Sequence, residues 1–443
     1  MPEVNSATVH LSPFGGFFVV LYHCCIHFVM SIVLRPHQVK ALKAQQQNDR
    51  GVICFPTGSG KTLVAVKDAM HRFESDDPKT VVVVAPRLLL SKQLATEYLE
   101  HIKNVRVLCV HSGKNQHYKT TKPEVIREWH QIHKDHDKLI FTTYHSLKKV
   151  KASMIPVDTY LFDEAHNSIR RDFFEEVEKT KEERTRAFFY TATPKHSNSY
   201  DRPGMNNTEV YGNTISTVAA DYLVDNGYIL QPELTVKHYE DDENAAERDN
   251  RILADIVDTE NIDKLMVCAK TTRSIISLFQ ETDFLEQMAA RDYSVLSITS
   301  MHGAFIDGEF VEKDAFFKTL NEWGKDDSKK FILFQYSMIG EGINLSCLES
   351  VVFMRKMQVS GVLQNIGRCI RLHPKDAEGM RNGTVIPGDA STYTKPVGKV
   401  IVPVFNKIQE QVAAFVEEII DRTFNDGETV IEEVGGSTKK KDS

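Results

Sequence analysis

A glycine-rich segment at residues 57–62 carries the strongest chemical signal in this sequence. Its residues are Thr57, Gly58, Ser59, Gly60, Lys61 and Thr62, and Pro56 precedes them. Glycines let several backbone N–H groups converge on one phosphate, and a helix that begins there adds a favourable dipole. Lys61 would reach the β- and γ-phosphates, and the Thr62 hydroxyl would bind Mg²⁺. The segment predicts a loop that binds a nucleoside triphosphate, although Phe55 stands where the strict pattern has glycine.

A pair of adjacent carboxylates, Asp163 and Glu164, follows an apolar run about 100 residues later. We expect the run to be a strand over residues 160–163, in which neighbouring side chains point to opposite faces. Asp163 would hold Mg²⁺, and Glu164 would orient and deprotonate the attacking water. A helix N-cap is the structural alternative for this pair.

The elements that must position these residues alternate along the chain. Apolar strand-like runs occur at residues 52–55, 81–85, 105–110, 139–143, 160–163 and 187–190, and again at 264–268, 294–298, 330–334, 350–354 and 400–404. Helical patterns lie between most of them, for example at residues 91–102 and 172–179. This alternation predicts an α/β fold with two mostly parallel sheets flanked by helices. The expected parts are an apolar extension (1–30), a first domain (31–213), a second domain (214–425) and a tail (426–443), with a surface loop at 376–395.

Composition limits the class of protein. The 443 residues are 41% apolar and 26% charged with a net charge of −7, as in ordinary globular proteins, so nucleic-acid contacts must be local. The seven cysteines form no Cys-x-x-Cys pair, which favours a reducing, intracellular compartment over a zinc module. His130, His133 and His136 have charged neighbours and fit a solvated helix face better than a metal site. Residues 14–34 are uncharged and long enough to span a bilayer, but no basic residue precedes them, so we expect a soluble protein.

Six short motifs in a fixed order resemble the superfamily 2 helicases and translocases in their DEAH-box form. They are the loop at 56–62 and the segments Arg35-Pro36-His37-Gln38, Asp163-Glu164-Ala165-His166, Thr191-Ala192-Thr193-Pro194, Gly340-Glu341-Gly342-Ile343-Asn344 and Gln364-Asn365-Ile366-Gly367-Arg368-Cys369-Ile370-Arg371. The resemblance covers about residues 34–405. It implies two tandem RecA-like domains with an ATP cleft between them, and an ATP-dependent helicase or translocase.

The same resemblance implies roles for further residues. Gln38, with Arg35, would read adenine, Gly342 would lie at the nucleotide, and Gln364 would be catalytic. His166, Thr191 and Thr193 would couple the state of the nucleotide to the grip on nucleic acid. Asn344 departs from many relatives, which have Asp at this position, and this leaves its coupling role less certain.

Two arginines would complete the hydrolytic site. Arg368 and Arg371 are three residues apart, so on one predicted helix they would share a face and form a fork for phosphate oxygens. If that helix faces the phosphate loop, both would contact the γ-phosphate only when the domains close. Pairing with local carboxylates is the alternative.

Residues at the ends of predicted strands are the candidates for nucleic-acid contacts: Pro86, Arg87, Gln93, Thr143, Thr271 and His302. Helix capping would also select Thr at such positions. By resemblance to phage UvsW-type, XPB-type and restriction-motor DNA helicases, DNA is favoured over RNA. An RNA remodeller, the motor subunit of a restriction-type complex and a non-catalytic scaffold remain as alternatives.

Overall fold

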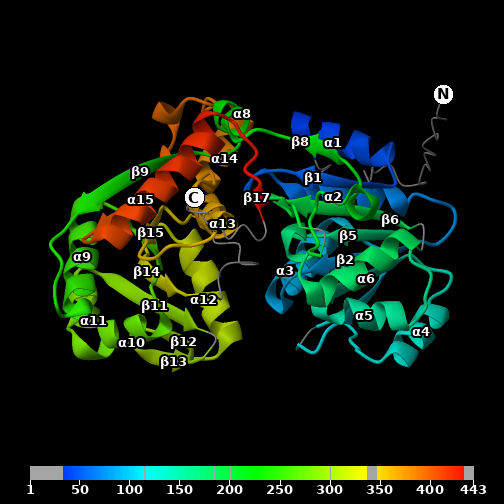
Figure 1. Ribbon diagram of the computed structural model, residues 1–443, viewed down its shortest axis with the longest axis horizontal. Helices are drawn as coiled ribbons and strands as arrows, with labels where there is room; N and C mark the ends of the chain where they lie inside the picture. The colour runs from blue at the N-terminus through cyan, green and yellow to red at the C-terminus, as the bar shows by residue number, and fades with distance from the viewer. Residues whose placement is uncertain are drawn as a thin grey trace, which may run out of the picture. The chain divides into compact units, whose positions relative to one another are not determined.

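The computed structural model describes residues 33–113, 116–182, 185–199, 201–299, 301–336 and 347–433. These residues build two β-sheets, each with helices on both faces (Figure 1). The expected extension at 1–30 lies outside the described residues. No described helix is both long enough and apolar enough to cross a membrane.

The first sheet has seven parallel strands in the order β3-β4-β2-β5-β6-β1-β8. The strands are β1 (Arg50–Cys54), β2 (Thr80–Ala85), β3 (Arg106–Val110), β4 (Lys138–Thr143), β5 (Thr159–Phe162), β6 (Arg186–Thr191) and β8 (Thr214–Thr217). The helices around it are α1 (Pro36–Gln46), α2 (Lys61–Arg72), α3 (Leu88–His101), α4 (Pro123–Ile132), α5 (Tyr144–Ala152), α6 (Arg171–Glu182), α7 (Thr208–Tyr211) and the short turn η1 (Ala165–Asn167).

The second sheet has eight strands in the order β13-β12-β11-β14-β10-β15-β16-β9, parallel except for the antiparallel pairs at the β12–β13 edge. The strands are β9 (Gln231–His238), β10 (Lys264–Cys268), β11 (Tyr293–Thr299), β12 (Gly303–Ile306), β13 (Glu309–Val311), β14 (Lys330–Gln335), β15 (Ser350–Phe353) and β16 (Val397–Val404). The helices are α8 (Ala220–Asp225), α9 (Ala245–Glu260), α10 (Thr272–Glu281), α11 (Phe284–Ala290), α12 (Lys313–Lys325), α13 (Val359–Cys369), α14 (Pro374–Asn382), η2 (Ala390–Thr392), α15 (Lys407–Ile420) and η3 (Asp421–Asn425).

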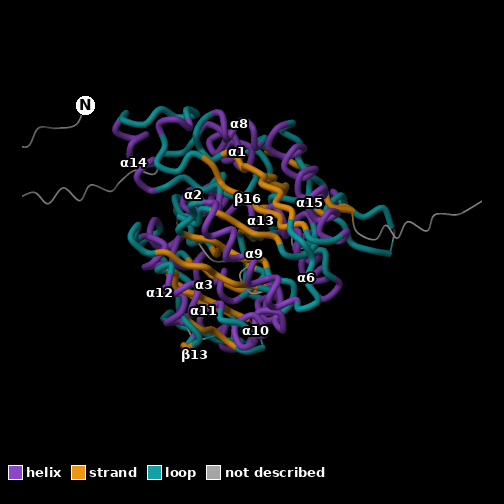
Figure 2. Tube along the Cα trace, turned by 90° about the vertical axis from the view of Figure 1, so that its left-hand side faces the viewer, coloured by secondary structure: helices purple, strands orange, loops and turns teal. Residues whose placement is uncertain are grey.

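Each sheet is apolar on both faces because helices cover both. In β2, Val81 and Val83 pack with α1, α2 and α3, whereas Val82 and Val84 pack with α4, α5 and α6. The second sheet packs α12, α13 and α15 on one face and α9, α10 and α11 on the other. Figure 2 shows the strands of both sheets running between helices. Continuous valine-rich strands of this kind belong in buried parallel sheets.

The predicted strands differ from the observed ones mostly by one or two residues, but two elements lie at unexpected places. β8 begins at residue 214, where we expected the second domain to start, yet it pairs with β1 of the first sheet. The surface loop expected at 376–395 includes most of α14 and all of η2, and its Asp376 and Lys395 are buried. The hairpin β12–β13 has no counterpart in the predicted strands.

A short ladder joins the end of the described chain to the first half. β17 (Glu432–Glu433) pairs with β7 (Lys195–His196), which directly follows the predicted coupling segment at 191–194. Glu432 N also donates to Pro194 O at 2.9 Å, and Lys195 Nζ lies 3.4 Å from Glu432 Oε1. The described part of the expected tail is therefore bonded to the rest of the molecule.

Candidate active site

The glycine-rich segment forms a tight loop between β1 and α2. Gly58 and Gly60 have φ values of 87° and 85°, a region that favours glycine. A side chain at Gly60 would also meet Gln38 Nε2, which lies 2.2 Å from the position of a Cβ atom. Lys61 Nζ donates to Phe55 O at 3.0 Å and to Pro56 O at 3.3 Å, so its ammonium lies inside the loop.

The start of α1 holds this loop from behind. Gln38 Nε2 donates to Ser59 O at 3.1 Å and to Gly60 O at 3.3 Å, while its Oε1 accepts from Arg35 N at 2.8 Å. His37 Nε2 donates to the same Ser59 carbonyl at 3.0 Å, and burial lowers the pKa of His37. Arg35 stacks over the ring of Tyr228 at 4.5 Å. The adenine-reading role of Arg35 and Gln38 stays a prediction, and the support that His37 gives to the loop was not foreseen.

The two carboxylates lie in a turn rather than on a strand. β5 ends at Phe162, so the alternation expected for a strand at 160–163 does not separate them. Glu164 has φ 45° and ψ 54°, the left-handed region, and this turn directs its carboxylate differently from that of Asp163. Burial and the neighbouring Glu164 raise the pKa of Asp163, and Lys61 opposes that rise.

A chain of polar contacts runs from Glu164 to the predicted coupling residues. Glu164 Oε2 lies 3.4 Å from His166 Nδ1, and that nitrogen lies 3.2 Å from Thr191 Oγ1. Thr191 Oγ1 in turn accepts a hydrogen bond from Thr193 N at 3.2 Å. His166 is only 4% exposed, so the chain is shielded from water. Through His166, the structure thus links the predicted coupling residues Thr191 and Thr193 to the candidate water-activating carboxylate.

One cavity of about 410 Å³ collects the candidate hydrolytic residues from both sheets. Its lining includes Thr57, Gly58, Gly60, Lys61, Thr62, Asp163 and Glu164 from the first half, and Gln364, Arg368 and Arg371 from the second. Gln364 and Arg368 lie on α13, as expected. Arg371 does not, because α13 ends at Cys369. The two arginines nevertheless reach the same cavity.

Glu97 on α3 is a cavity residue that the sequence motifs did not indicate. It lines the cavity with Gln93, whose Nε2 donates to Glu97 Oε1 at 2.6 Å. Burial raises the pKa of Glu97, and the charge of Arg371 opposes this rise. Gln93, which we expected at nucleic acid, therefore lies beside the phosphate loop. Positions 93 and 97 share a helix face, so the placement of α3 at the cavity brings both side chains to its lining.

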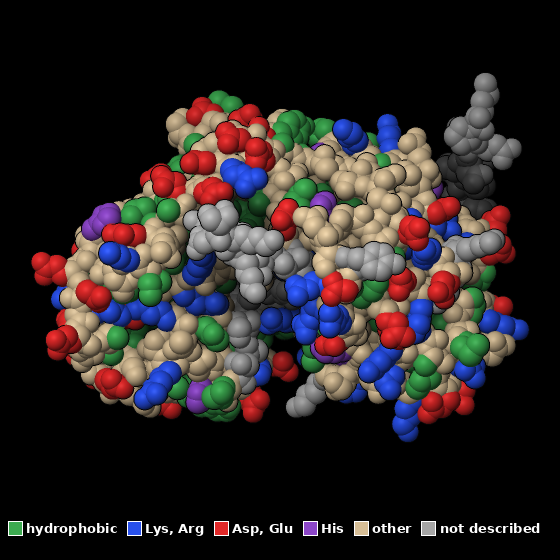
Figure 3. Space-filling view, viewed as in Figure 1, with side chains coloured by type: hydrophobic (Ala, Val, Ile, Leu, Met, Phe, Trp, Pro, Cys, Tyr) green, Lys and Arg blue, Asp and Glu red, His purple; other side chains and the backbone are tan. Residues whose placement is uncertain are grey.

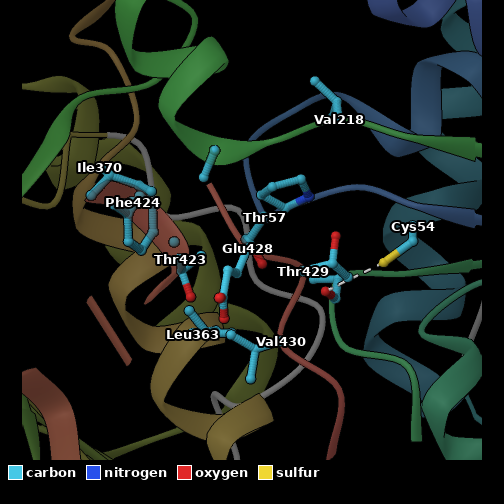
Figure 4. A pocket seen from close by; sticks show the side chains of 14 residues that line it. Cys54, Thr57, Val218, Leu363, Ile370, Thr423, Phe424, Glu428, Thr429 and Val430 are labelled. Atoms are coloured by element: carbon cyan, nitrogen blue, oxygen red, sulfur yellow. Dashed lines mark hydrogen bonds between the residues drawn. The ribbon is translucent and has the colours of Figure 1, made fainter. Parts of the chain in front are cut away.

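The two halves touch directly at the loop. Gly367 of α13 has no side chain, and a Cβ atom there would come within 2.4 Å of Thr57 Cβ. Next to this contact is a small cavity of about 20 Å³ between the halves. It is lined by residues of the loop, of α13 and of the chain after α15. Figure 4 shows Thr57, Leu363 and Ile370 near Phe424, Glu428 and Val430 around it.

The other candidate nucleic-acid residues follow strand ends as expected. Pro86 and Arg87 come after β2, Thr143 ends β4, Thr271 precedes α10 and His302 follows β11. Arg87, Thr271 and His302 are exposed, but Thr143 is 7% exposed and precedes α5 without a capping hydrogen bond from its side chain. Figure 3 shows Lys and Arg side chains gathered in a band on the half that contains the second sheet, between α15 and α10. Contacts of these residues with nucleic acid stay predictions.

The donor set at the loop fits Mg²⁺. Thr62 offers a hydroxyl and Asp163 a carboxylate to the same cavity, and both are hard oxygen ligands. Mg²⁺ commonly takes one or two protein ligands together with substrate phosphates. Within the described ranges, no group of three or more His, Cys, Asp or Glu could hold a metal ion, and His130 Nε2 instead lies 3.1 Å from Thr80 Oγ1. Gly342 lies outside the described residues.

Known proteins share parts of this sequence. Residues 31–196 match the family described as "Type III restriction enzyme, res subunit". The chain is 23% identical over 206 residues to the type I restriction enzyme SauMSSORF170P endonuclease subunit of Staphylococcus aureus, which is 45% of this chain and 21% of that protein. It is 24% identical over 210 residues to the SsaAORF53P endonuclease subunit of Staphylococcus saprophyticus, with the same coverage. The matched region spans about a fifth of the length of these relatives.

Solved structures share the fold over most of the chain. The ATP-dependent type ISP restriction-modification enzyme LlaBIII bound to DNA superposes with a TM-score of 0.65 and 16% identity, covering 92% of this chain and 32% of that chain. The Mycobacterium smegmatis helicase Lhr bound to ssDNA and AMP-PNP gives 0.58 and 17%, covering 91% and 50%. These matches confirm the predicted fold of two tandem RecA-like domains. At this level of identity the likeness shows the fold, and the family match covers residues 31–196, the part that contains the phosphate loop and the two carboxylates.

Proposed function

We propose that this protein is an ATP-dependent DNA translocase or helicase. One observation supports this above the others: a single cavity contains the phosphate loop and carboxylates of one half and the arginines of the other. Groups divided in this way act together only in one arrangement of the halves, so hydrolysis can be coupled to their opening and closing. DNA is favoured over RNA because the motifs resemble DNA translocases and because LlaBIII was solved bound to DNA.

The cavity supplies the parts that phosphoryl transfer needs. The loop amides and Lys61 would bind the phosphates, and Thr62 with Asp163 would hold Mg²⁺, which neutralises charge on the phosphate oxygens. Glu164, oriented by its left-handed turn and by His166, would accept the proton of the attacking water. Arg368 and Arg371 would stabilise charge that develops on the γ-phosphate.

Steady-state ATP hydrolysis tests this proposal. We expect Mg²⁺-dependent turnover that single-stranded or forked DNA stimulates several-fold more than RNA of the same length, and that EDTA abolishes. Lys61→Ala should reduce turnover by at least about 100-fold, because one phosphate-binding cation is lost, with an unchanged far-UV circular dichroism spectrum. If Lys61→Ala hydrolyses ATP as fast as wild type, the proposed site is wrong. If RNA stimulates hydrolysis more than DNA does, the substrate is RNA instead of DNA.

A second candidate, the motor part of a restriction-type complex, is favoured by the matched family and by the staphylococcal endonuclease subunits. Displacement of a triplex-forming strand from duplex DNA separates the two. ATP-dependent displacement without strand separation supports a duplex translocase, whereas release of one strand from a forked substrate supports a helicase. Affinity for DNA should fall as salt rises, because phosphate contacts release counterions.

A further inference from the structure

The turn that follows α13 carries Arg371, and its backbone carbonyls are bound from two directions. Ile370 O accepts from Leu230 N at 2.7 Å. The carbonyls of Cys369 and Arg371 both accept from the ammonium of Lys395, the second at 3.2 Å. The last carbonyls of a helix have no partner within it, and a cation there also interacts favourably with the helix dipole.

Lys395 is a buried cation with three carbonyl partners. Its side chain is 6% exposed, and besides Cys369 and Arg371 it donates to Leu348 O at 2.5 Å. An ammonium group has three N–H donors and no acceptor, so three carbonyls use its full capacity. A buried charge is costly unless it is hydrogen-bonded in this way.

Asp376 fixes the backbone from which Lys395 extends. Its side chain is 1% exposed; Oδ1 accepts from Thr394 N at 2.7 Å and Oδ2 from Lys395 N at 3.1 Å. The segment between α14 and β16 is therefore anchored at both the backbone and the side chain of Lys395.

We propose that Lys395 is a positioning residue for Arg371: by binding the carbonyls on either side of Ile370, it holds the turn so that the guanidinium enters the cavity of the phosphate loop. Lys395 itself does not line that cavity. The inference rests on the proposed function, since it assumes that Arg371 acts on the nucleotide.

The protonation of Lys395 gives this role a pH signature. The groups around the ammonium are the thiols of Cys369 and Cys347, the carboxyl of Glu349 and the guanidinium of Arg371. Burial lowers the pKa of Lys395 to about 8, whereas it raises the pKa of Cys369 to about 12 and also raises those of Cys347 and Glu349. A neutral amine keeps two N–H donors for three carbonyls, so the turn loses a bond as pH rises through 8.

The test compares ATP hydrolysis by five full-length proteins: wild type, Lys395→Met, Lys395→Arg, Arg371→Ala and the double variant Lys395→Met/Arg371→Ala. We expect Lys395→Met to lower kcat at least tenfold while KM for ATP changes less than threefold. We expect kcat of wild type to decline above pH 8. Lys395→Arg, which stays charged, should retain most of the turnover and lack that decline. If Lys395 acts through Arg371, the double variant should be no slower than Arg371→Ala alone.

The outcomes separate this inference from the proposed function. The positioning role is wrong if Lys395→Met has the kcat of wild type. It is also wrong if Lys395→Met lowers kcat as much in the Arg371→Ala background as it does in wild type. An unchanged kcat in Arg371→Ala would instead remove the role of that arginine in the proposed function. Should Lys395→Met fail to fold, the pH profiles of wild type and Lys395→Arg decide, because identical profiles between pH 7 and 9 contradict the inference.

Discussion

Glu164 is a non-glycine residue held in the left-handed region, at φ 45°. That conformation costs roughly 1–2 kcal/mol, and such strain concentrates at functional sites. In this chain the left-handed residue lies two positions after the end of β5, and its carboxylate lies near His166. Asp163, one residue earlier, lines the same cavity as Thr62. The conformation of one residue thus directs the carboxylate proposed to activate water differently from the one proposed to bind the metal.

At the residue scale, Arg371→Ala should lower kcat for ATP at least about 100-fold while changing KM for ATP little, because a finger of this kind contributes mainly in the transition state. Rapid-mix ATPase kinetics measure both parameters. Arg381→Ala, at an exposed position of α14, is the matched control and should behave as wild type. An equal loss in kcat and in ATP affinity would mean that Arg371 only supports nucleotide binding.

At the element scale, α13 is the part of the second half that touches the loop. Its contact needs a glycine, since a Cβ atom at position 367 would come within 2.4 Å of Thr57 Cβ. Cys369 and Ile370 continue the helix into the turn that carries Arg371. The helix therefore makes one close contact between the halves, and the turn after it carries Arg371.

Gly367→Ala should separate stability from activity. Alanine favours a helix interior over glycine by about 1 kcal/mol, so the melting temperature should stay the same or rise, while the added methyl group holds α13 away from the loop. We expect ATP hydrolysis to fall at least tenfold. Gly361→Ala on the same helix is the control, because its Cβ would meet the flexible end of Met357 at 3.1 Å. Equal activity in both variants would show that the contact does not matter.

The sequence predicted the elements whose signal is local and missed those that depend on packing at a distance. Apolar runs indicated β2 and β10 to within a residue, and the glycine spacing indicated the loop. β8 has only four residues, of which one is buried, and it pairs with the distant strand β1 (Val52 with Thr214), so no local pattern revealed it. Arg371 lies beyond α13 because Ile370 ends the helical hydrogen bonds, and helical spacing alone could not show that end.

The same limit applies to the candidate site. Lys61, Asp163 and Glu164 were recognisable from spacing, and the structure brings them to one cavity. Glu97 and Lys395 belong to no sequence motif. Each is assigned to the site through its interaction with Arg371, which is distant in the sequence from Glu97 and separated from Lys395 by α14. Gln93 was assigned to nucleic acid from its place after a strand, whereas the face of α3 turns it toward Glu97.

At the scale of the whole molecule, the ladder of β17 with β7 connects the chain after α15 to the coupling segment. Glu432→Lys should place a lysine against Lys195, whose ion pair with Glu432 is largely buried. We expect a several-fold higher KM for ATP with a nearly unchanged kcat, since closure of the halves is weakened. The exchange Lys195→Glu/Glu432→Lys should restore KM. Steady-state kinetics at fixed DNA concentration check this, and a wild-type KM in the single variant would contradict it.

If the proposed opening and closing of the halves occurs, this ladder also limits how far they can separate. Six residues, 426–431, lie between the end of η3 and the start of β17. A fully stretched chain covers at most about 3.5 Å per residue, so this leash can reach roughly 20 Å. While β17 stays paired with β7, the ends of this segment cannot be farther apart than that length. A larger separation would first have to break the pairing of Glu432 and Glu433 with β7.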